Sequence, residues 1–382
     1  MLKLPPLSLY IHIPWCIRKC PYCDFNSHEV GKNPALPEQE YLAALKTDLM
    51  DSARYAQQRK LHTIFFGGGT PSIVSSDTIA ASLKMVDEII GIRSNAEITL
   101  EANPGTFEQE KFSGFREAGV NRLSIGVQSL NQERLNALGR IHSKDEAESS
   151  IQIARYAGFE NINLDLMYGL PNQTVEEALI ELEQLIALEP EHISWYELTI
   201  EPNTEFYSSP PARPEDDLIA AMSDAGIALL ASAGYERYEI SAYAKDKKHC
   251  AHNLNYWEFG DYLGIGAGAH EKVTLADSAK ILRRSKTRLP KHYIERIGSY
   301  AASENLVENS DRSFEFCMNA LRLTSGVSVD LFAQRTGLPV KQLETLLQEQ
   351  VTTGLLHPIE TQIRATETGI RYLNSLLEPL LD

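Results

Sequence analysis

Three cysteines near the N-terminus carry the strongest chemical signal in this 382-residue sequence. Cys16, Cys20 and Cys23 follow directly after an apolar segment, in the pattern Cys-x3-Cys-x2-Cys. A [4Fe–4S] cluster is held by thiolates on a loop that wraps it, and three protein thiolates leave one iron open to an outside ligand. The alternatives are reactive thiols or a zinc site completed by His28 or His12. Zinc is disfavoured because it prefers paired Cys-x2-Cys spacings, and the sequence offers no second pair.

A glycine-rich segment, Gly67-Gly68-Gly69-Thr70-Pro71, follows a second apolar segment. Three glycines let backbone amides approach a charged group closely. A phosphate-binding loop is the alternative interpretation, but no Gly-Lys-Ser/Thr sequence follows, so the sequence disfavours a mononucleotide site.

Polar side chains stand where the later apolar segments end. Glu101, Gln128 and Asp165 close three such segments, and Arg140 lies in the segment Leu-Gly-Arg-Ile-His that follows one of them. In βα barrels the carboxyl ends of the strands converge on the active-site face. Each of these residues taken alone is explained equally well as a satisfied cap or core hydrogen-bonding group. Together with the cysteines they predict a cofactor pocket.

A third informative segment is His252-Asn-Leu-Asn-Tyr256-Trp257. An imidazole can ligate heme iron, and two aromatic rings offer flat apolar surface to a macrocycle. The residues alone favour the alternative, a histidine and two aromatic rings packed in a domain seam. Residues 280–291 hold six Lys and Arg in an acidic protein. Heme propionates or an anionic membrane surface are candidate partners, whereas a solvated strand edge explains most of them more simply.

Alternating strand and helix patterns must position these residues. Tyr41, Leu42, Leu45 and Leu49 share one helical face after the first strand, and Ser143 with Glu146 and Thr174 with Glu177 have capping-box spacing, as Thr106 has with Gln109. Six strands are predicted, over residues 8–13, 61–66, 97–101, 121–127, 161–167 and 192–199. This alternation predicts a parallel α/β sheet with right-handed crossovers, curved into a partial (β/α)6 barrel, two units short of a complete eightfold barrel.

The pattern changes after the sixth strand. Residues 201–217 have the proline-rich and acidic composition of a linker. We expect a barrel domain over residues 1–235, a region that completes or links the barrel over 236–300, and a small α+β, winged-helix-like domain over 301–382. The last region has a net charge of −5, which disfavours DNA recognition.

Composition limits the remaining classes of function. The net charge of −16 argues against nucleic-acid partners, because phosphate binding depends on Lys and Arg. The sequence contains neither a long apolar span nor a signal-peptide pattern. Five cysteines in such a chain favour metal or redox chemistry over a disulfide framework. We expect a cytoplasmic protein, with the periphery of the inner membrane as a second possible place.

The cysteine loop after the first strand of a βα barrel resembles the radical S-adenosylmethionine (SAM) superfamily, whose cluster binds SAM at its open iron. The resemblance implies a partial (β/α)6 radical SAM barrel, in which the glycine-rich segment holds the methionine end of SAM. It also implies SAM contacts at matching positions, with Tyr22 where the family uses an aromatic residue for a second SAM. The other contacts are Tyr10, Gly68, Gly69, Thr70, Glu101, Gln128, Arg140 and Asp165.

Motifs across nearly the whole chain narrow the resemblance to the coproporphyrinogen dehydrogenase (HemN-type) group. They are residues 8–26 and the segments GGGTP, EANPG, GVQS, LGRIH and NLDLMYGLP. The resemblance implies a HemN-type C-terminal domain. This sequence has Phe25 where the enzyme of that group has a further cysteine, and it lacks the longer N-terminal extension. Both departures weigh against decarboxylation of coproporphyrinogen III.

The segment from His252 to Trp257 resembles the HNxxYW signature of the heme chaperone branch of this group. The resemblance implies a [4Fe–4S] cluster, SAM and heme as bound groups, with His252 as the heme contact. It further implies delivery of heme to apo-hemoproteins of respiration, some of them at the membrane, and allows a homodimer. Whether the chain is also an enzyme of porphyrin metabolism is left open. The alternatives are an oxygen-independent coproporphyrinogen III dehydrogenase and an iron–sulfur protein with a vestigial SAM site.

Overall fold

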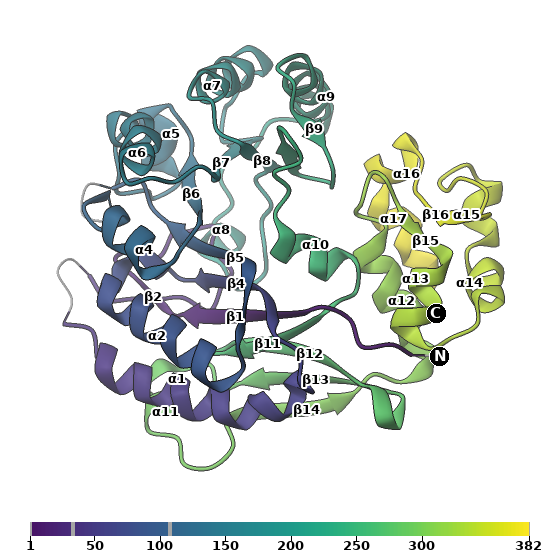
Figure 1. Ribbon diagram of the computed structural model, residues 1–382. Coiled ribbons are helices and arrows are strands. Elements are labelled where there is room, and N and C mark those ends of the chain that lie inside the picture. The colour runs from purple at the N-terminus through teal and green to yellow at the C-terminus, as the bar shows by residue number, and fades with distance from the viewer. Residues whose placement is uncertain (1, 32–34, 106–108, 382) are drawn as a thin grey trace.

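The computed structural model of the chain describes residues 2–31, 35–105 and 109–381. An open sheet runs through most of these residues, with helices packed on its outer face (Figure 1). Its twelve strands follow the order β14-β13-β12-β11-β1-β4-β5-β6-β7-β8-β10-β9. The seven strands from β11 to β8 are parallel neighbours. The parallel sheet with crossover helices that the sequence predicted is confirmed.

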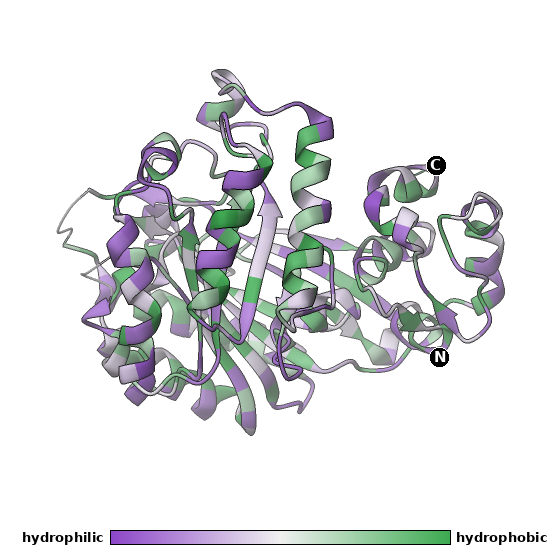
Figure 2. Cartoon of the chain, turned by 90° about the horizontal axis from the view of Figure 1, so that it is seen from above, coloured by the Kyte–Doolittle hydropathy of each residue, from purple (hydrophilic) through white to green (hydrophobic). Residues whose placement is uncertain are grey.

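The six predicted strands form the centre of this sheet in chain order. They are β1 (Leu7–Ile13), β4 (Leu61–Gly68), β5 (Ile92–Ala102), β6 (Arg122–Gln128), β7 (Ile162–Tyr168) and β8 (His192–Glu197). The covering helices are α1 (Glu38–Ser52), α2 (Ser76–Ile89), α4 (Phe112–Ala118), α5 (Gln132–Ala137), α6 (Lys144–Tyr156), α7 (Val175–Ala187) and α9 (Asp216–Ser232). Figure 2 shows hydrophobic and hydrophilic residues interspersed along these helices, as expected of helices with one face on a sheet. The short helix α8 (Glu205–Ser208) lies instead against the cysteine loop, where the Phe206 amide donates to the Pro21 carbonyl oxygen at 2.9 Å.

Local sequence signals explain where several of these helices begin. Ser143 caps α6 and Thr174 caps α7, each in a complete capping box with the glutamate three residues later. Each box satisfies backbone N–H groups that the first helical turn leaves without partners. The predicted helix start at Thr106 lies outside the described residues.

The chain after β8 adds strands to both edges of the sheet. β9 (Glu236–Arg237) and β10 (Ala242–Ala244) extend it antiparallel beyond β8. After the short helix α10 (Ala251–Trp257), the chain returns to the opposite edge, where β11 (Asp261–Ile265) pairs parallel with β1. The antiparallel strands β12 (His270–Leu275), β13 (Lys280–Lys286) and β14 (Ala301–Leu306) follow; the short helix α11 (Pro290–Ile294) lies between the last two.

Buried ion pairs connect strands β12 and β13, at this edge of the sheet, to α1. Lys286 Nζ lies 2.6 Å from Asp48 of α1, and Arg284 lies 2.7 Å from Glu271 and 2.6 Å from Asp51. Arg284 and Lys286 have fully buried side chains, so a solvated strand edge is the wrong explanation for these two members of the basic run. Removing one partner from such a buried pair costs about 3–5 kcal/mol, because the other charge stays buried alone.

A second hydrophobic core lies in the C-terminal part of the chain, around Phe316, Phe332 and Leu343. Its elements are α12 (Asn309–Ala320), β15 (Val327–Ser328), α13 (Val329–Thr336), α14 (Val340–Leu346), α15 (Gln348–Thr352), β16 (Gln362–Ile363), α16 (Glu367–Arg371) and α17 (Leu373–Leu377). The N-terminal segment reaches this unit (Figure 1), where the Lys3 amide donates to the Gln334 carbonyl oxygen at 2.8 Å. The domain limits at residues 235 and 300 stay predictions.

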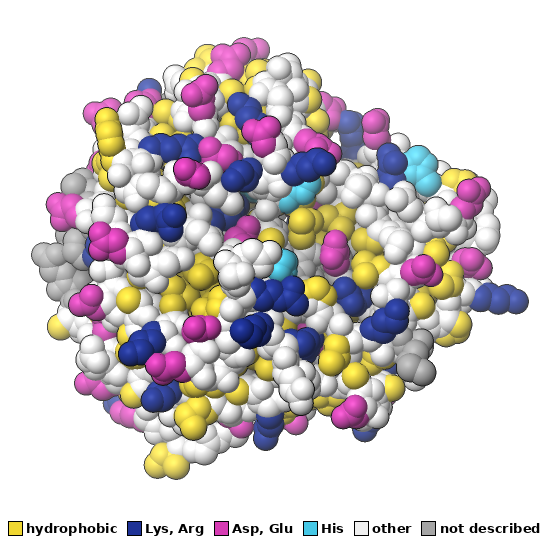
Figure 3. Space-filling model, viewed as in Figure 1, with side chains coloured by type: hydrophobic (Ala, Val, Ile, Leu, Met, Phe, Trp, Pro, Cys, Tyr) yellow, Lys and Arg dark blue, Asp and Glu magenta, His cyan; other side chains and the backbone are white. Residues whose placement is uncertain are grey.

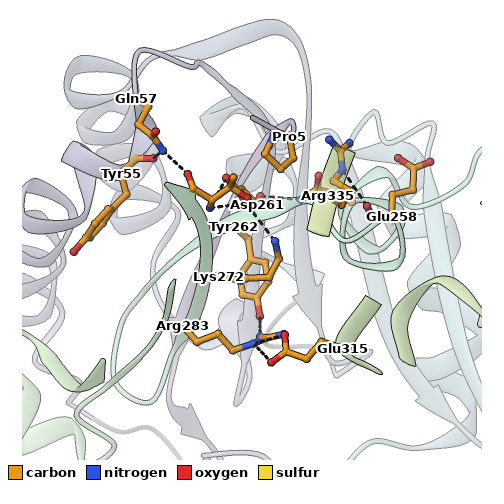
Figure 4. Close-up of polar contacts among 12 residues, drawn as sticks. Pro5, Tyr55, Gln57, Glu258, Asp261, Tyr262, Lys272, Arg283, Glu315 and Arg335 are labelled. Atoms are coloured by element: carbon orange, nitrogen blue, oxygen red, sulfur yellow. Dashed lines mark hydrogen bonds and ion pairs between the residues drawn. The ribbon is translucent and has the colours of Figure 1, made fainter. Parts of the chain in front are cut away.

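Polar contacts join this C-terminal unit to strands β11–β13 (Figure 4). Arg283 of β13 forms an ion pair of 2.6 Å with Glu315 of α12, and also donates to the Tyr262 hydroxyl at 3.2 Å. Arg335 Nε of α13 donates to the Glu258 carbonyl oxygen at 3.2 Å. These contacts hold the C-terminal unit against the edge of the barrel. No helix among the described residues is long and apolar enough to cross a membrane.

Candidate functional site

The three cysteines lie around one cavity at the carboxyl end of β1. Cys16 is in the two-residue strand β2 (Trp15–Cys16), which pairs with β3 (His28–Glu29), so the chain between them forms a closed loop. Within this loop the Cys23 amide donates to the Cys20 carbonyl at 3.1 Å. All three cysteines line a cavity of about 460 Å³, which we call the cysteine cavity.

The surroundings of Cys16 and Cys23 disfavour free thiolates. Burial raises the pKa of Cys16 to about 11, although a hydrogen bond of 3.5 Å from the Thr70 hydroxyl acts in the opposite direction. Burial also raises the pKa of Cys23. Bound metal ions stabilise thiolates in such a place. No three His, Cys, Asp or Glu side chains of the described residues are arranged to hold a single metal ion. A [4Fe–4S] cluster spreads its thiolates over separate irons, and three cysteines around one cavity suit that donor set.

Close packing beneath the cysteine loop requires glycine in the glycine-rich segment. Gly68 has φ +117°, and a Cβ there would lie 2.5 Å from the His12 ring; a Cβ at Gly69 would lie 2.5 Å from the Trp15 carbonyl oxygen. The amides of Gly69 and Thr70 donate to carbonyl groups of the β1–β2 segment at 2.8 Å. Because these amides already have partners, the segment acts as a close-packed support and does not form a phosphate-binding loop.

Two buried carboxyl groups in the wall of the cysteine cavity have raised pKa values. The pKa of Glu101 is raised to about 8, first by desolvation and then by Asp165, while the Gly68 amide at 3.2 Å opposes the shift. Desolvation also raises the pKa of Asp165, although Asn163 donates to it at 2.7 Å. Neither forms an ion pair with any described residue. Arg122 and Arg140 partly offset the shift at Asp165.

The opposite wall is held by hydrogen bonds among polar side chains. Gln128 has φ +69° and accepts a hydrogen bond of 2.6 Å from the Tyr196 hydroxyl. Arg140 donates to Asn103 Oδ1 at 2.7 Å and lies 3.7 Å from the Cys20 sulfur. Burial raises the pKa of Tyr22, which also lines this cavity. These contacts fix the polar groups before any ligand enters.

A second, larger cavity of about 810 Å³ adjoins the first. Four histidines line it, and we call it the histidine cavity. It lies between the barrel, α10 and α12; Figure 3 shows a hollow on this face where hydrophobic, His and basic side chains meet. The two cavities share six wall residues, namely Asp24, Phe25, Glu101, Ser124, Asp165 and Ser194.

His252 lies in the wall of the histidine cavity as part of a hydrogen-bonded chain. Its Nδ1 is 2.7 Å from the Thr63 hydroxyl, which donates onward to Ser8, and its Nε2 is 2.8 Å from the Tyr256 hydroxyl. Its side chain is buried, and its pKa is lowered to about 3 by desolvation and then by Arg122. Both ring nitrogens are therefore engaged within the protein. Tyr256 and Trp257 line the same cavity.

The structure distributes the predicted contact residues over both cavities. The cysteine cavity is lined by Cys16, Cys20, Tyr22, Cys23, Gly69, Thr70, Glu101, Gln128, Arg140 and Asp165. The histidine cavity is lined by Tyr10, Gly68, Glu101, Asp165 and His252. Arg122, His192 and His270 also line the histidine cavity, although the sequence did not predict them as site residues. No local motif marks them; only the pairing of distant strands brings them together.

Comparisons with known proteins agree with this architecture. Residues 10–186 match the model of the radical SAM superfamily, and residues 307–372 match that of the HemN C-terminal domain. The solved structure of coproporphyrinogen III oxidase (HemN) from Escherichia coli superposes with a TM-score of 0.82 at 23% identity, over 99% of this chain and 90% of that one. The fold is therefore a radical SAM barrel with a HemN-type C-terminal domain.

Curated relatives narrow the family further. The chain is 50% identical to the heme chaperone HemW of Haemophilus influenzae, over 100% of this chain and 99% of the relative. It is 49% identical to HemW of Escherichia coli over the full length of both, and 35% identical to HemW of Bacillus subtilis over 95% of this chain and 96% of the relative. The chain belongs to the HemW family of radical SAM proteins.

Proposed function

We propose that this protein is a heme chaperone that binds heme in the histidine cavity and delivers it to apo-hemoproteins such as respiratory enzymes. The observation that carries this proposal is the large cavity walled by His252, Tyr256 and Trp257 beside the cysteine cavity. Its volume of about 810 Å³ lies in the range of small-molecule sites. The curated relatives are named heme chaperones, which supports the same function.

The cysteine cavity has a separate role in this proposal. Cys16, Cys20 and Cys23 would hold a [4Fe–4S] cluster, and Glu101 with Asp165 would face the positive charges of SAM. When bound, such a cluster would supply the electron for the chemistry of SAM. Glu101 and Asp165, which line the cysteine cavity, would orient SAM. Cluster and SAM would regulate oligomerisation, a homodimer included, or heme transfer.

An oxygen-independent coproporphyrinogen III dehydrogenase is the second candidate function. The acidic groups and the cysteine loop are compatible with either function. Phe25 favours the chaperone, because it occupies the position of the further cysteine of that enzyme and presents an apolar ring, 59% exposed, to both cavities.

Incubation of the reconstituted protein with each ligand separates the two functions. One sample receives heme; a second receives coproporphyrinogen III, SAM and a reductant. We expect stoichiometric heme uptake and no vinyl-containing product. Formation of protoporphyrinogen would refute the chaperone as the main function. Heme transfer from the loaded protein to an apo-hemoprotein tests delivery. A comparison of transfer with and without membrane vesicles tests whether delivery occurs in the cytoplasm or at the inner-membrane surface.

A further inference from the structure

Of the four histidines that line the histidine cavity, only one has uncommitted ring nitrogens. His12, His192 and His252 each have both nitrogens in hydrogen bonds of 2.6 to 3.1 Å. His270 makes no side-chain hydrogen bond or ion pair with any described residue. A histidine must present a bare nitrogen to bind iron, so His270 is the one that loses no protein contact on coordination.

The backbone holds His270 in a fixed position while its ring remains free. It is the first residue of β12 and pairs in register with Ser285 of β13. The hairpin also packs closely on β11, because a Cβ at Gly264 would collide with the His270 backbone. A ligand on a rigid strand is better oriented than one on a loop.

Two further side chains suit a flat, anionic ligand at the same opening. Arg288 is exposed, lines the cavity and forms no ion pair with the described residues. Its carbonyl oxygen accepts a hydrogen bond of 2.9 Å from Asn26 Nδ2, which ties this part of the chain to the cysteine loop. Phe25, one residue earlier in that loop, presents its ring to the cavity. An apolar ring and a free guanidinium are complementary to a macrocycle that carries carboxylates.

We propose that His270 would supply the ligand nitrogen to the heme iron, that Phe25 would pack on the macrocycle, and that Arg288 would pair with a propionate at the opening of the cavity. This inference rests on the proposed heme-binding function. In this arrangement His252 is a positioning residue, because its hydrogen bond holds the hydroxyl group of Tyr256, which lines the cavity.

Heme titration of the full-length protein tests the assignment. The iron–histidine stretching band of the ferrous complex is recorded by resonance Raman spectroscopy for the wild type and for His270→Ala, His252→Gln and His292→Ala. His292 lies on α11 away from the cavity lining and is the matched control. We expect His270→Ala alone to lose the band, to bind heme about tenfold more weakly or worse, and to recover the band when free imidazole is added. Arg288→Gln should reduce the preference for heme over its dimethyl ester.

The outcomes separate this inference from the proposed function. A wild-type protein that takes up no heme overturns both. A wild-type protein that binds heme, together with a His270→Ala variant that keeps the band, overturns the ligand assignment alone; loss of the band in His252→Gln would then assign the iron to His252. Far-ultraviolet circular dichroism of each variant establishes that the fold is retained.

Discussion

Glu101 offers a quantitative test of the cationic ligand in the cysteine cavity. Its pKa of about 8 means that the carboxyl group is mostly protonated at neutral pH in the ligand-free protein. If SAM binds only when Glu101 is ionised, each unit of pH below 8 weakens SAM binding up to tenfold, because the proton on the carboxyl group must first be removed. Affinity should fall roughly 90-fold from about pH 9 to about pH 6, equivalent to about 2.7 kcal/mol. Glu101→Gln abolishes this titration and should give weaker binding with a flat pH profile.

Equilibrium dialysis of radiolabelled SAM against the anaerobically reconstituted protein measures this profile. Glu201→Gln is the matched control, since Glu201 is another carboxylate that lines the same cavity, and it should keep the wild-type slope. A Glu101→Gln variant with the same slope as the wild type would show that another group controls the pH dependence. A wild-type profile that is flat over the whole range would refute the link between Glu101 and SAM.

Three other substitutions test the surroundings of the site. Cys16→Ser should reduce iron from about four atoms per chain to near none, whereas Cys317→Ala, in the second core, should retain it; equal iron contents would contradict the cluster assignment. Lys286→Met leaves Asp48 buried without its cation and should lower the free energy of unfolding by about 3–5 kcal/mol, so an unchanged urea midpoint would be inconsistent with the buried pair. Gly69→Ala places a Cβ 2.5 Å from a carbonyl oxygen of β2 and should displace the cysteine loop, which iron analysis would detect; full iron content would refute that close packing.

Local patterns were sufficient to predict the centre of the sheet and several of the helices that cover it, but α9 and the short helix α8, within the expected linker over residues 201–217, were not predicted. Apolar runs and capping boxes act within a few residues, and the boxes at Ser143 and Thr174 form as predicted. The start of β5 was missed, because Arg93 to Asn95 are exposed and lack an apolar alternation. The place of β11 next to β1 was also missed, since this pairing joins distant parts of the chain and no local signal encodes it.

The same difference between local and distant signals applies to the site. The cysteine cavity could be predicted because its residues lie at the ends of successive strands, as Glu101, Gln128 and Asp165 do. The histidine cavity could be predicted only through His252, whose segment carries a recognisable motif. His270 has no motif of its own, and its place in the cavity depends on how β11 and β12 pack beside β1.

The pairing of β11 with β1 also sets the order in which the newly made chain can fold. β1 emerges early from the ribosome, but its outer neighbour follows about 250 residues later. At a synthesis rate of about 5–20 residues per second, that edge stays unpaired for roughly 10–50 s. An open strand edge is a template for aggregation, so the nascent chain needs protection during this interval. A version of the gene truncated before β11 should therefore yield insoluble protein, even though it encodes all three cysteines.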